Sequence, residues 1–485
     1  MKVNKKYRKQ LKKFLSSEEV EKLLKYIRKP LTKSIKINTN KVTPNQFTTL
    51  NKQQWYTLES PNIKIPREKQ KDLFYIDRKD RSLPLWKTFY HQSWFFYIQE
   101  IAAWIPPKLF HLKENNLILD MCASPWGKTI QLANYLQQEG NKKWFVISND
   151  INRKRIFSLA WNINRMWAYN TGITNINGAR FWKNLPETFD HILVDALCTW
   201  EWTWYKSVEA IKYWRPKQVK RISRIQSHLL ASAVKAVKPW GSIIYSTCTM
   251  NPYENETNIK HILDTYSKYL ELENIDIHQK SKGLTNLEQE RNLTSKEASK
   301  VLRMRPHIQE TGWFFIAKLK KTKSLYPKLE NTTNYLQPDK LFNWFYSSNI
   351  QEKFKKFLKD VYGIKISTKY FAFIETNTQV YITSKKAFSL IDTLKFEKIW
   401  VPILISCWNK FIPTHYFWCL LWSYAKKNYI EVDYETAQNY AFKENIVLSK
   451  PKKSTYDYVV IRYKWYGIWV WKLEGKKIKN KYINT

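Results

Sequence analysis

The sequence predicts an α/β protein built around a doubly wound, mostly parallel sheet of Rossmann-like topology. Short apolar runs alternate with helical stretches between about residues 110 and 320, a tight loop follows the first run, and short strand-like segments fill the C-terminal region. Such alternation is typical of a parallel sheet covered by helices, with its ligand site at the carboxyl ends of the strands.

Hydrophobic periodicity places the elements of this central unit. Apolar runs of strand length lie over residues 117–121, 145–148, 191–196 and 242–246. Apolar residues recur with helical spacing over residues 128–138, 153–165 and 217–237. A late hairpin that includes residues 314–319 is expected to close the sheet.

Two further units are expected to flank the central one, which we place at residues 106–322. A small α+β unit, residues 1–105, combines a predicted helix over residues 16–27 with an alternating strand over residues 34–42. The polar residues 323–340 form the expected linker. Residues 341–485 are expected to be β-rich, with strands in the segments YFAFIE, TQVYIT, DYVVIRY and IWVWKL.

The charge of the chain indicates a polyanionic partner. Its 485 residues include 82 lysines and arginines against 41 acidic residues, a formal net charge of +41. Such an excess is typical of proteins that bind nucleic acid. The chain is also rich in Asn, Ile and Tyr, which suggests an AT-rich genome that raises lysine content generally. Charge therefore favours nucleic acid and specifies nothing finer.

Cysteine usage and hydropathy predict a cytoplasmic protein without a membrane span. The five cysteines contain no C-x-x-C pair, so neither a disulfide framework nor a metal site is expected. The basic N-terminus lacks the apolar core of a signal peptide. Prolines and polar residues interrupt the most apolar stretch, residues 399–425, too often for a bilayer span. We expect a monomer.

Tryptophan stands where turns call for glycine. The chain has 23 tryptophans and only 10 glycines, which together make up about 7% of it, the share that glycine alone has in an average protein. Glycine supplies the positive φ and the close backbone approach that turns need. We therefore hypothesise that many of these tryptophans are glycines in the cell, encoded by UGA codons that some bacterial lineages read as glycine. The alternative is a tryptophan-rich surface that stacks nucleobases.

A loop and a strand end indicate a nucleoside cofactor. The run DMCASPWGKT, residues 120–129, would place backbone donors and a helix N-terminus around a charged or polar cofactor tail. Asp150 ends the next predicted strand, where a carboxylate can bind ribose hydroxyls. Each feature alone is weak evidence for a nucleoside cofactor, and their occurrence in this order along the chain makes the evidence stronger.

Two cysteines end neighbouring strands of the predicted sheet. Cys198 follows Asp195 at the end of one strand, and Cys248 lies in the segment STCT at the end of the next. A lone buried cysteine is usually a small apolar residue. Two of them beside an aspartate and a cofactor loop instead indicate covalent chemistry, in which a thiolate adds to an electron-poor ring carbon.

These motifs resemble those of the Sun-type RNA cytosine-C5 methyltransferases, which use S-adenosylmethionine (SAM). The family pattern DMCAAPGGKT is matched by residues 120–129, DAPCSGEG by residues 195–202 and STCT by residues 246–249. The segments YIQE, NPYENE and RMRPHIQETGWFF are also similar to family segments, and the last thirty or so residues resemble a PUA-like RNA-binding domain. The resemblance implies a Rossmann-like SAM methyltransferase with RNA as its partner.

The resemblance also implies a role for each site residue. Cys248 would attack C6 of cytosine, and Cys198 would assist removal of the C5 proton and release of the enzyme. Asp195 would hydrogen-bond the base near N3, and Lys128 would lie close to the base. The implied SAM-binding residues are Cys122, Ala123, Ser124, Pro125, Trp126, Gly127, Lys128, Asp150, Asn177 and Asp195. Asn177 stands where the family usually has Asp, and Leu197 where it has Pro.

Against the family pattern, the tryptophans fall into two groups. Trp214 matches a family tryptophan, whereas the following fall where glycine is wanted: Trp94, Trp126, Trp167, Trp200, Trp202, Trp240, Trp313, Trp465, Trp469 and Trp471. If Trp126 and Trp200 are real, an inactive RNA-binding relative is favoured, because an indole of roughly 150–250 Å² would obstruct the cofactor loop.

The favoured interpretation is therefore an active RNA cytosine-C5 methyltransferase, with small-subunit ribosomal RNA as its substrate. Transfer RNA stays open as a substrate, because transfer RNA methyltransferases share the core motifs. A DNA cytosine methyltransferase would use Cys198 as its nucleophile, and both STCT and the PUA-like end argue against that assignment.

Overall fold

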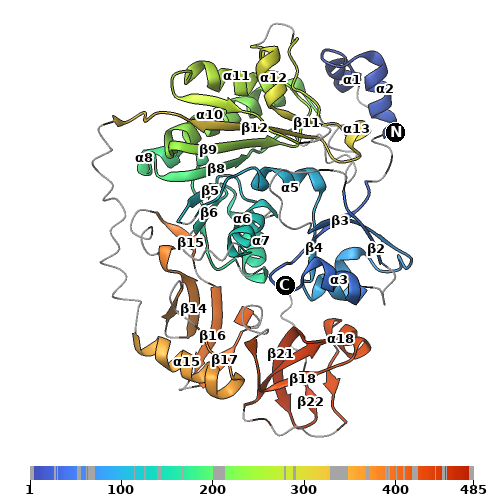
Figure 1. Ribbon diagram of the computed structural model, residues 1–485, viewed down its shortest axis with the longest axis vertical. Coiled ribbons are helices and arrows are strands. Elements are labelled where there is room, and N and C mark those ends of the chain that lie inside the picture. Colours follow the sequence, from blue (N-terminus) through green and yellow to red (C-terminus); the bar gives the residue numbers. More distant parts are fainter. Residues whose placement is uncertain are drawn as a thin grey trace.

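A computed structural model gives the fold of the chain. It describes residues 5–479 except the segments 27–28, 30, 52–55, 62, 64–71, 114, 125–126, 139–144, 167, 200–213, 278–279, 288–290, 328–347, 367–370, 377, 388–389, 391–393, 400, 408–409, 415, 418–423, 443, 450–453 and 455. A large central sheet carries helices on both faces, and three smaller sheets lie to one side of it (Figure 1).

The central sheet has nine strands, and its parallel core confirms the predicted topology. The strand order is β10-β12-β9-β8-β5-β6-β7-β15, with β11 paired to β12. Strands β5 to β9 run parallel, and β10, β11, β12 and β15 are antiparallel to their neighbours. The bounds are β5 Leu117–Asp120, β6 Phe145–Asn149, β7 Thr171–Thr174, β8 Phe189–Asp195, β9 Val237–Thr247, β10 Leu270–Glu273, β11 Leu302–Met304, β12 Phe314–Lys321 and β15 Phe396–Lys398.

Both faces of this sheet are buried, because successive side chains of a strand point to opposite faces. On β5, Leu117 and Leu119 pack in one apolar cluster with Leu230 of the long helix α10, whereas Ile118 packs in another with Trp104 of α5. The helices of this unit are α5 Ile101–Lys108, α6 Gly127–Gln138, α7 Arg153–Arg165, α8 Phe181–Asn184, α10 Pro216–Ala236, α11 Glu256–Thr265, α12 Ser295–Lys300 and α13 Pro306–Gln309. The predicted helices 128–138, 153–165 and 217–237 are confirmed within one residue at each end.

The N-terminal residues form two separate pieces. A helical pair lies against α13 and the start of α10, apart from the four-stranded sheet β2-β3-β1-β4 (Figure 1). The bounds are α1 Lys5–Leu11, α2 Ser17–Tyr26, β1 Ser34–Ile37, α3 Pro44–Asn51, β2 Tyr56–Glu59, β3 Leu73–Arg78, α4 Phe89–Gln92 and β4 Phe96–Ile98. The strand predicted over residues 34–42 was wrong beyond Ile37, because the chain turns at Asn38, whose carbonyl accepts from Lys41 N at 2.8 Å.

The C-terminal region contains two small sheets. The first, β13-β14-β16-β17, packs against α15, and the second, β18-β20-β21-β22-β19, packs against α18. The bounds are α15 Ser348–Tyr362, β13 Phe371–Glu375, β14 Gln379–Ser384, β16 Val401–Cys407, β17 Lys410–Pro413, β18 Tyr429–Glu431, α18 Tyr434–Ala441, β19 Ile446–Val447, β20 Tyr458–Tyr463, β21 Tyr466–Glu474 and β22 Lys477–Ile478. The expected linker 323–340 falls largely outside the described residues.

One apolar core joins the N-terminal sheet to the C-terminal region. Phe89 of α4 meets the Tyr463 ring of β20 edge-on, with centroids 5.7 Å apart. The buried Lys41 donates from Nζ to the carbonyl of Gly467 at 2.8 Å. A strand of the C-terminal region, β15, also extends the central sheet beside β7. The N-terminal sheet and the C-terminal region therefore pack against each other, and the C-terminal region also pairs with the central sheet.

No helix in the described part of the chain combines the length and the apolar character that a bilayer crossing requires.

Three of the suspect tryptophans adopt left-handed backbone. The φ angles are 61° at Trp94, 65° at Trp240 and 71° at Trp465. A side chain in this region costs roughly 1–2 kcal/mol, and glycine avoids that cost. Trp313, Trp469 and Trp471 are not left-handed, and Trp126, Trp167, Trp200 and Trp202 lie outside the described residues. The backbone thus supports glycine at three of the ten positions.

A buried histidine makes the stability of the central sheet sensitive to acid. His191 lies on β8 with its ring 5.1 Å from that of Phe110, and burial lowers its pKa from 6.5 to about 4. A lowered histidine pKa means that the folded state disfavours the proton. The stability from this site is therefore complete above pH 6.5 and is lost as the pH falls toward 4.

We expect His191→Gln to weaken this acid sensitivity. Between pH 7 and about pH 4.5, the unfolding free energy of the variant should fall by about 2–3 kcal/mol less than that of the wild type. Urea unfolding at the two pH values measures the difference. Equal losses in both proteins would show that His191 is protonated as readily in the folded chain as in the unfolded one.

Candidate active site

The predicted cofactor loop crosses from β5 to α6 at the carboxyl edge of the sheet. The amide of Ala123 donates to the carbonyl of Asn149 at 2.7 Å, and that of Ser124 donates to Oδ2 of Asp150 at 3.3 Å. The Arg155 guanidinium donates to the Ser124 carbonyl and lies 3.7 Å from the Asp150 carboxylate. These bonds hold the loop against the end of β6. Pro125 and Trp126 lie outside the described residues.

A buried carboxyl group at the end of β5 binds the first turn of α6, next to the predicted cofactor loop. Asp120 ends β5 and accepts from the Thr129 hydroxyl of α6 at 2.6 Å. Burial raises the pKa of Asp120 to about 7, with the charge of Asp195 adding to the effect. Burial also raises the pKa of the Cys122 thiol, so this cysteine is held as a neutral thiol and is unsuited to act as a nucleophile.

Asn177 lies near the same edge as the N-cap of a short turn. Its side chain accepts from the amide of Ala179 at 3.1 Å, which caps the turn Gly178–Arg180. Its neighbour Asn175 donates to the carbonyl of Asp150 at 2.7 Å. Asn177 is exposed, so its amide is placed to add a polar group at the rim of the loop.

The four expected catalytic residues meet beside the loop, from three elements. Sγ of Cys198 lies 2.9 Å from Sγ of Cys248. Nζ of Lys128, in the first turn of α6, lies 2.6 Å from Oδ2 of Asp195 at the end of β8. Oδ1 of Asp195 accepts from the Ser246 hydroxyl at 2.6 Å, across the β8–β9 pairing. Strand pairing thus brings two thiols, a carboxylate and an ammonium to one site.

A buried glutamate holds the two cysteine loops together. Glu254 accepts from the backbone amide of Thr199 at 3.1 Å and from its hydroxyl at 2.6 Å. Gln226 of α10 donates to Glu254 at 2.9 Å and to the carbonyl of Leu197 at 2.8 Å. Thr199 also lies 3.2 Å from Thr249, hydroxyl to hydroxyl. Residues on both sides of the paired thiols are therefore fixed.

We call these contacts of Glu254 the Glu254 clamp, and they were not predicted from the sequence. Glu254 belongs to the segment NPYENE, which the resemblance marks without giving it a role. Asn255 of the same segment accepts from the Thr247 hydroxyl at 2.6 Å and donates to the Thr249 carbonyl at 2.9 Å. Glu254 and Asn255 have no exposed surface, and buried polar groups need such partners, but this burial is visible only in the structure.

The residues of the loop fit a nucleoside cofactor. Asp150 is a carboxylate at a strand end beside a turn of backbone amides, which suits ribose hydroxyls and a charged tail. Gly127 lies so close to Gln99 that a Cβ at this position would stand 3.2 Å from the side-chain nitrogen. A side chain at residue 127, at the start of α6, would therefore crowd Gln99.

A doubly wound sheet with a ligand loop at its carboxyl edge is the architecture of enzymes that bind nucleotide cofactors, and similarity to known proteins makes this one a SAM-dependent methyltransferase. Residues 107–320 match the family model described as 16S rRNA methyltransferase RsmB/F. The matched residues are those of the central sheet and its helices, so this domain is similar to the RsmB/F family.

Curated relatives extend the similarity over nearly the whole chain. A ribosomal RNA small subunit methyltransferase F from Shewanella oneidensis is 29% identical over 457 residues, which cover 93% of this chain and 90% of the relative. The enzyme of the same name from Vibrio vulnificus is 26% identical over 473 residues, 96% of this chain and 93% of the relative.

Solved structures share the fold. A methyltransferase homologue from Pyrococcus horikoshii has a TM-score of 0.54 at 25% identity, over 66% of this chain and 95% of that one. NSun6 from the same organism, solved with the SAM analogue SFG, has a TM-score of 0.52 at 22% identity, over 66% of this chain and 99% of that one.

Proposed function

We propose that this protein methylates C5 of a cytosine in small-subunit ribosomal RNA, through a covalent bond between Cys248 and C6 of the base. The observation that carries the proposal is the pairing of the Cys198 and Cys248 thiols at 2.9 Å, beside the Lys128–Asp195 ion pair. One thiol alone could only add to the base, whereas two can divide attack and proton removal between them.

SAM supplies an electrophilic methyl group when it is bound. The thiolate of Cys248 forms a bond to C6, which moves electron density onto C5 and toward N3. As charge grows on N3, N3 takes up the proton released from the Cys248 thiol, and the Asp195 carboxylate, which Lys128 holds in place, accepts a hydrogen bond from that N3–H. After C5 has taken the methyl group, Cys198 removes the C5 proton. The C5–C6 double bond then re-forms as the bond from Cys248 to C6 breaks.

The choice of ribosomal RNA rests on three supports. The curated relatives that match nearly the whole chain carry that substrate in their names. The net charge of +41 suits a phosphate backbone. Attack on C6 needs the face of an unstacked base, and single-stranded RNA regions supply such bases. The same substrate implies action in the cytoplasm, and monomeric action stays a prediction.

The test is methylation of defined RNA by the purified full chain. With SAM that carries a labelled methyl group, we expect label to enter a small-subunit ribosomal RNA transcript and nucleoside mass spectrometry to find 5-methylcytidine. Transfer RNA transcripts and a cytosine-rich DNA strand serve as parallel substrates.

Each outcome decides between the interpretations. Label in transfer RNA alone would show that transfer RNA, and not ribosomal RNA, is the substrate. Label in a nucleoside other than cytidine would refute methylation at C5 of cytosine. RNA binding without any methyl transfer would favour the inactive relative. A reaction without SAM serves as the blank.

A further inference from the structure

Two helices far apart in the sequence carry only basic charge. The 21 residues of α10 and the seven of α1 contain no Asp or Glu. On α10, Lys217, Lys220, Arg221 and Arg224 lie on one exposed face, opposite the buried Val219 and Ile222. By contrast, α2 mixes three acidic residues with its lysines. The basic composition of these two helices therefore exceeds the general lysine richness of the chain.

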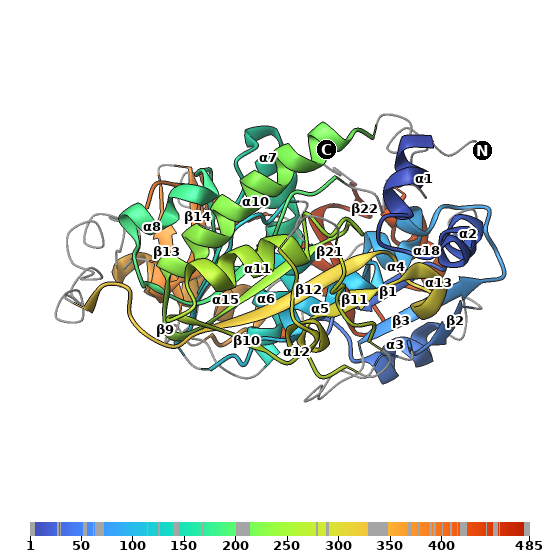
Figure 2. The ribbon, with the colours of Figure 1, turned by 90° about the horizontal axis from the view of Figure 1, so that it is seen from above.

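The two helices meet through their apolar sides. The Tyr7 ring of α1 meets the Trp214 ring at the start of α10 edge-on, with centroids 5.3 Å apart. Tyr7 and Leu11 are buried in one cluster with Trp214 and Val219. Burial of this side of α1 leaves Lys5 and Lys9 exposed on its other side. Figure 2 shows α1 beside the beginning of α10.

This surface lies next to the catalytic loops. Met250, two residues after Cys248, is buried in the same cluster as Tyr7. Ser223 of α10 donates to the carbonyl of Tyr253 at 2.8 Å, and Gln226 donates to that of Leu197 beside Cys198. Both helices are thus anchored on the segments that hold the two cysteines.

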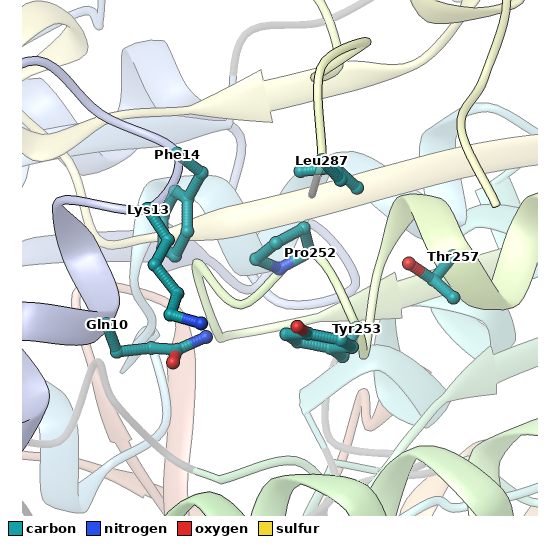
Figure 3. A pocket seen from close by; sticks show the side chains of 7 residues that line it. All are labelled: Gln10, Lys13, Phe14, Pro252, Tyr253, Thr257 and Leu287. Atoms are coloured by element: carbon teal, nitrogen blue, oxygen red, sulfur yellow. The ribbon is translucent and has the colours of Figure 1, made fainter. Parts of the chain in front are cut away.

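A shallow hollow connects α1 to the same segment. Gln10, Lys13 and Phe14 line one side of it, and Pro252, Tyr253, Thr257 and Leu287 line the other. Figure 3 shows the Gln10 amide of α1 and the Lys13 ammonium of the turn after it extended toward the side of the Tyr253 ring. A cation and polar groups therefore continue from α1 toward the residues after Cys248.

We propose that Lys217, Lys220, Arg221 and Arg224 of α10, together with Lys5 and Lys9 of α1, bind the phosphate backbone of the substrate RNA. We call these six residues the basic strip. Among the described residues, none of the six forms an ion pair with a carboxylate. The partner is RNA because the inference rests on the proposed function. The strip would hold the strand beside the site where the target cytosine meets Cys248.

The test removes three charges from α10 and measures RNA binding as a function of salt. For Lys217→Gln, Lys220→Gln, Arg224→Gln in the full chain, the slope of log affinity against log salt should lessen by about 2, since each single-strand phosphate contact contributes roughly 0.7. At about 0.15 M salt, this corresponds to a roughly 50-fold rise in Kd for a small-subunit ribosomal RNA transcript. The KM for RNA should rise with it, and kcat at saturating RNA should stay within about twofold, because none of the three residues touches the thiols.

A matched variant removes the same charge at the opposite edge of the sheet. Lys183, Lys268 and Lys323 are exposed and lie next to strand ends remote from the cysteines. Their joint change to Gln should leave both slope and Kd nearly as in the wild type. Equal weakening of RNA binding by both triple variants would overturn the proposal that the basic strip binds RNA. A salt slope in the α10 variant equal to that of the wild type would overturn it as well. If the wild type binds RNA but transfers no methyl group, the proposed function fails while the binding comparison still decides the strip.

Discussion

Cys248→Ala is expected to abolish methyl transfer, with a loss of roughly 10⁴- to 10⁶-fold in rate, because the proposed mechanism assigns the bond to C6 to Cys248. Cys198→Ala should also stop turnover, but at a later step. Without the second thiol, the C5 proton stays and the bond between Cys248 and C6 does not break. The Cys198→Ala protein should therefore accumulate a covalent complex with RNA.

The complex is measured as labelled RNA that migrates with the protein in a denaturing gel. Cys407→Ala is the matched control, because Cys407 lies on β16 in a different sheet, and it should neither trap RNA nor slow methylation. Because the two sulfur atoms are only 2.9 Å apart, their positions alone do not distinguish the two roles, and the trapped complex does. A complex that forms in Cys248→Ala and not in Cys198→Ala would exchange the two roles and weaken the assignment to RNA.

Replacing Trp240 or Trp465 by glycine is expected to stabilise a chain produced with tryptophan at these positions. Both residues have positive φ, and their side chains are 70% and 73% exposed, so little packing is lost. Relief of the left-handed strain should raise the unfolding free energy by about 1 kcal/mol per site. Thermal or urea unfolding measures the change.

Alanine and a second tryptophan supply the controls. Trp240→Ala removes the ring but keeps Cβ, so it should gain less than Trp240→Gly. Trp214 is buried against Tyr7, and Trp214→Gly should cost about 3–5 kcal/mol. If Trp240→Gly and Trp240→Ala behave alike, φ is not the cause. Peptide mass spectrometry from the native organism tests the decoding directly: glycine at residues 240 and 465 with tryptophan at residue 214 would establish it, and tryptophan at all three would refute it.

The central elements could be predicted because each is specified locally. The helix expected over residues 153–165 is α7 itself, since its apolar residues repeat with helical spacing. Strand β7, Thr171–Thr174, was missed because a four-residue run with threonines and a glycine resembles a loop. Strand β15 was missed for a different reason. It belongs to a region more than 200 residues away in the chain from its partner β7, and only tertiary contacts pair them.

The site divides in the same way. The chain order of its motifs predicted that the loop, Asp195 and the two cysteines lie together, because each follows a strand and parallel strands end at one edge. The Glu254 clamp could not be predicted, since its partners Thr199 and Gln226 approach it only through the pairing of β8 with β9 and the packing of α10.

What the amino-acid order fixed is the type of domain and the chemical groups it carries, because strand and helix periods and short motifs act over a few residues. The folded chain decided how those groups meet: the thiols at 2.9 Å, Lys128 on Asp195, α1 against α10, and left-handed backbone at Trp94, Trp240 and Trp465. These contacts join residues from tens to hundreds of positions apart. Their geometry depends on burial and packing summed over the whole core, and no local pattern contains that information.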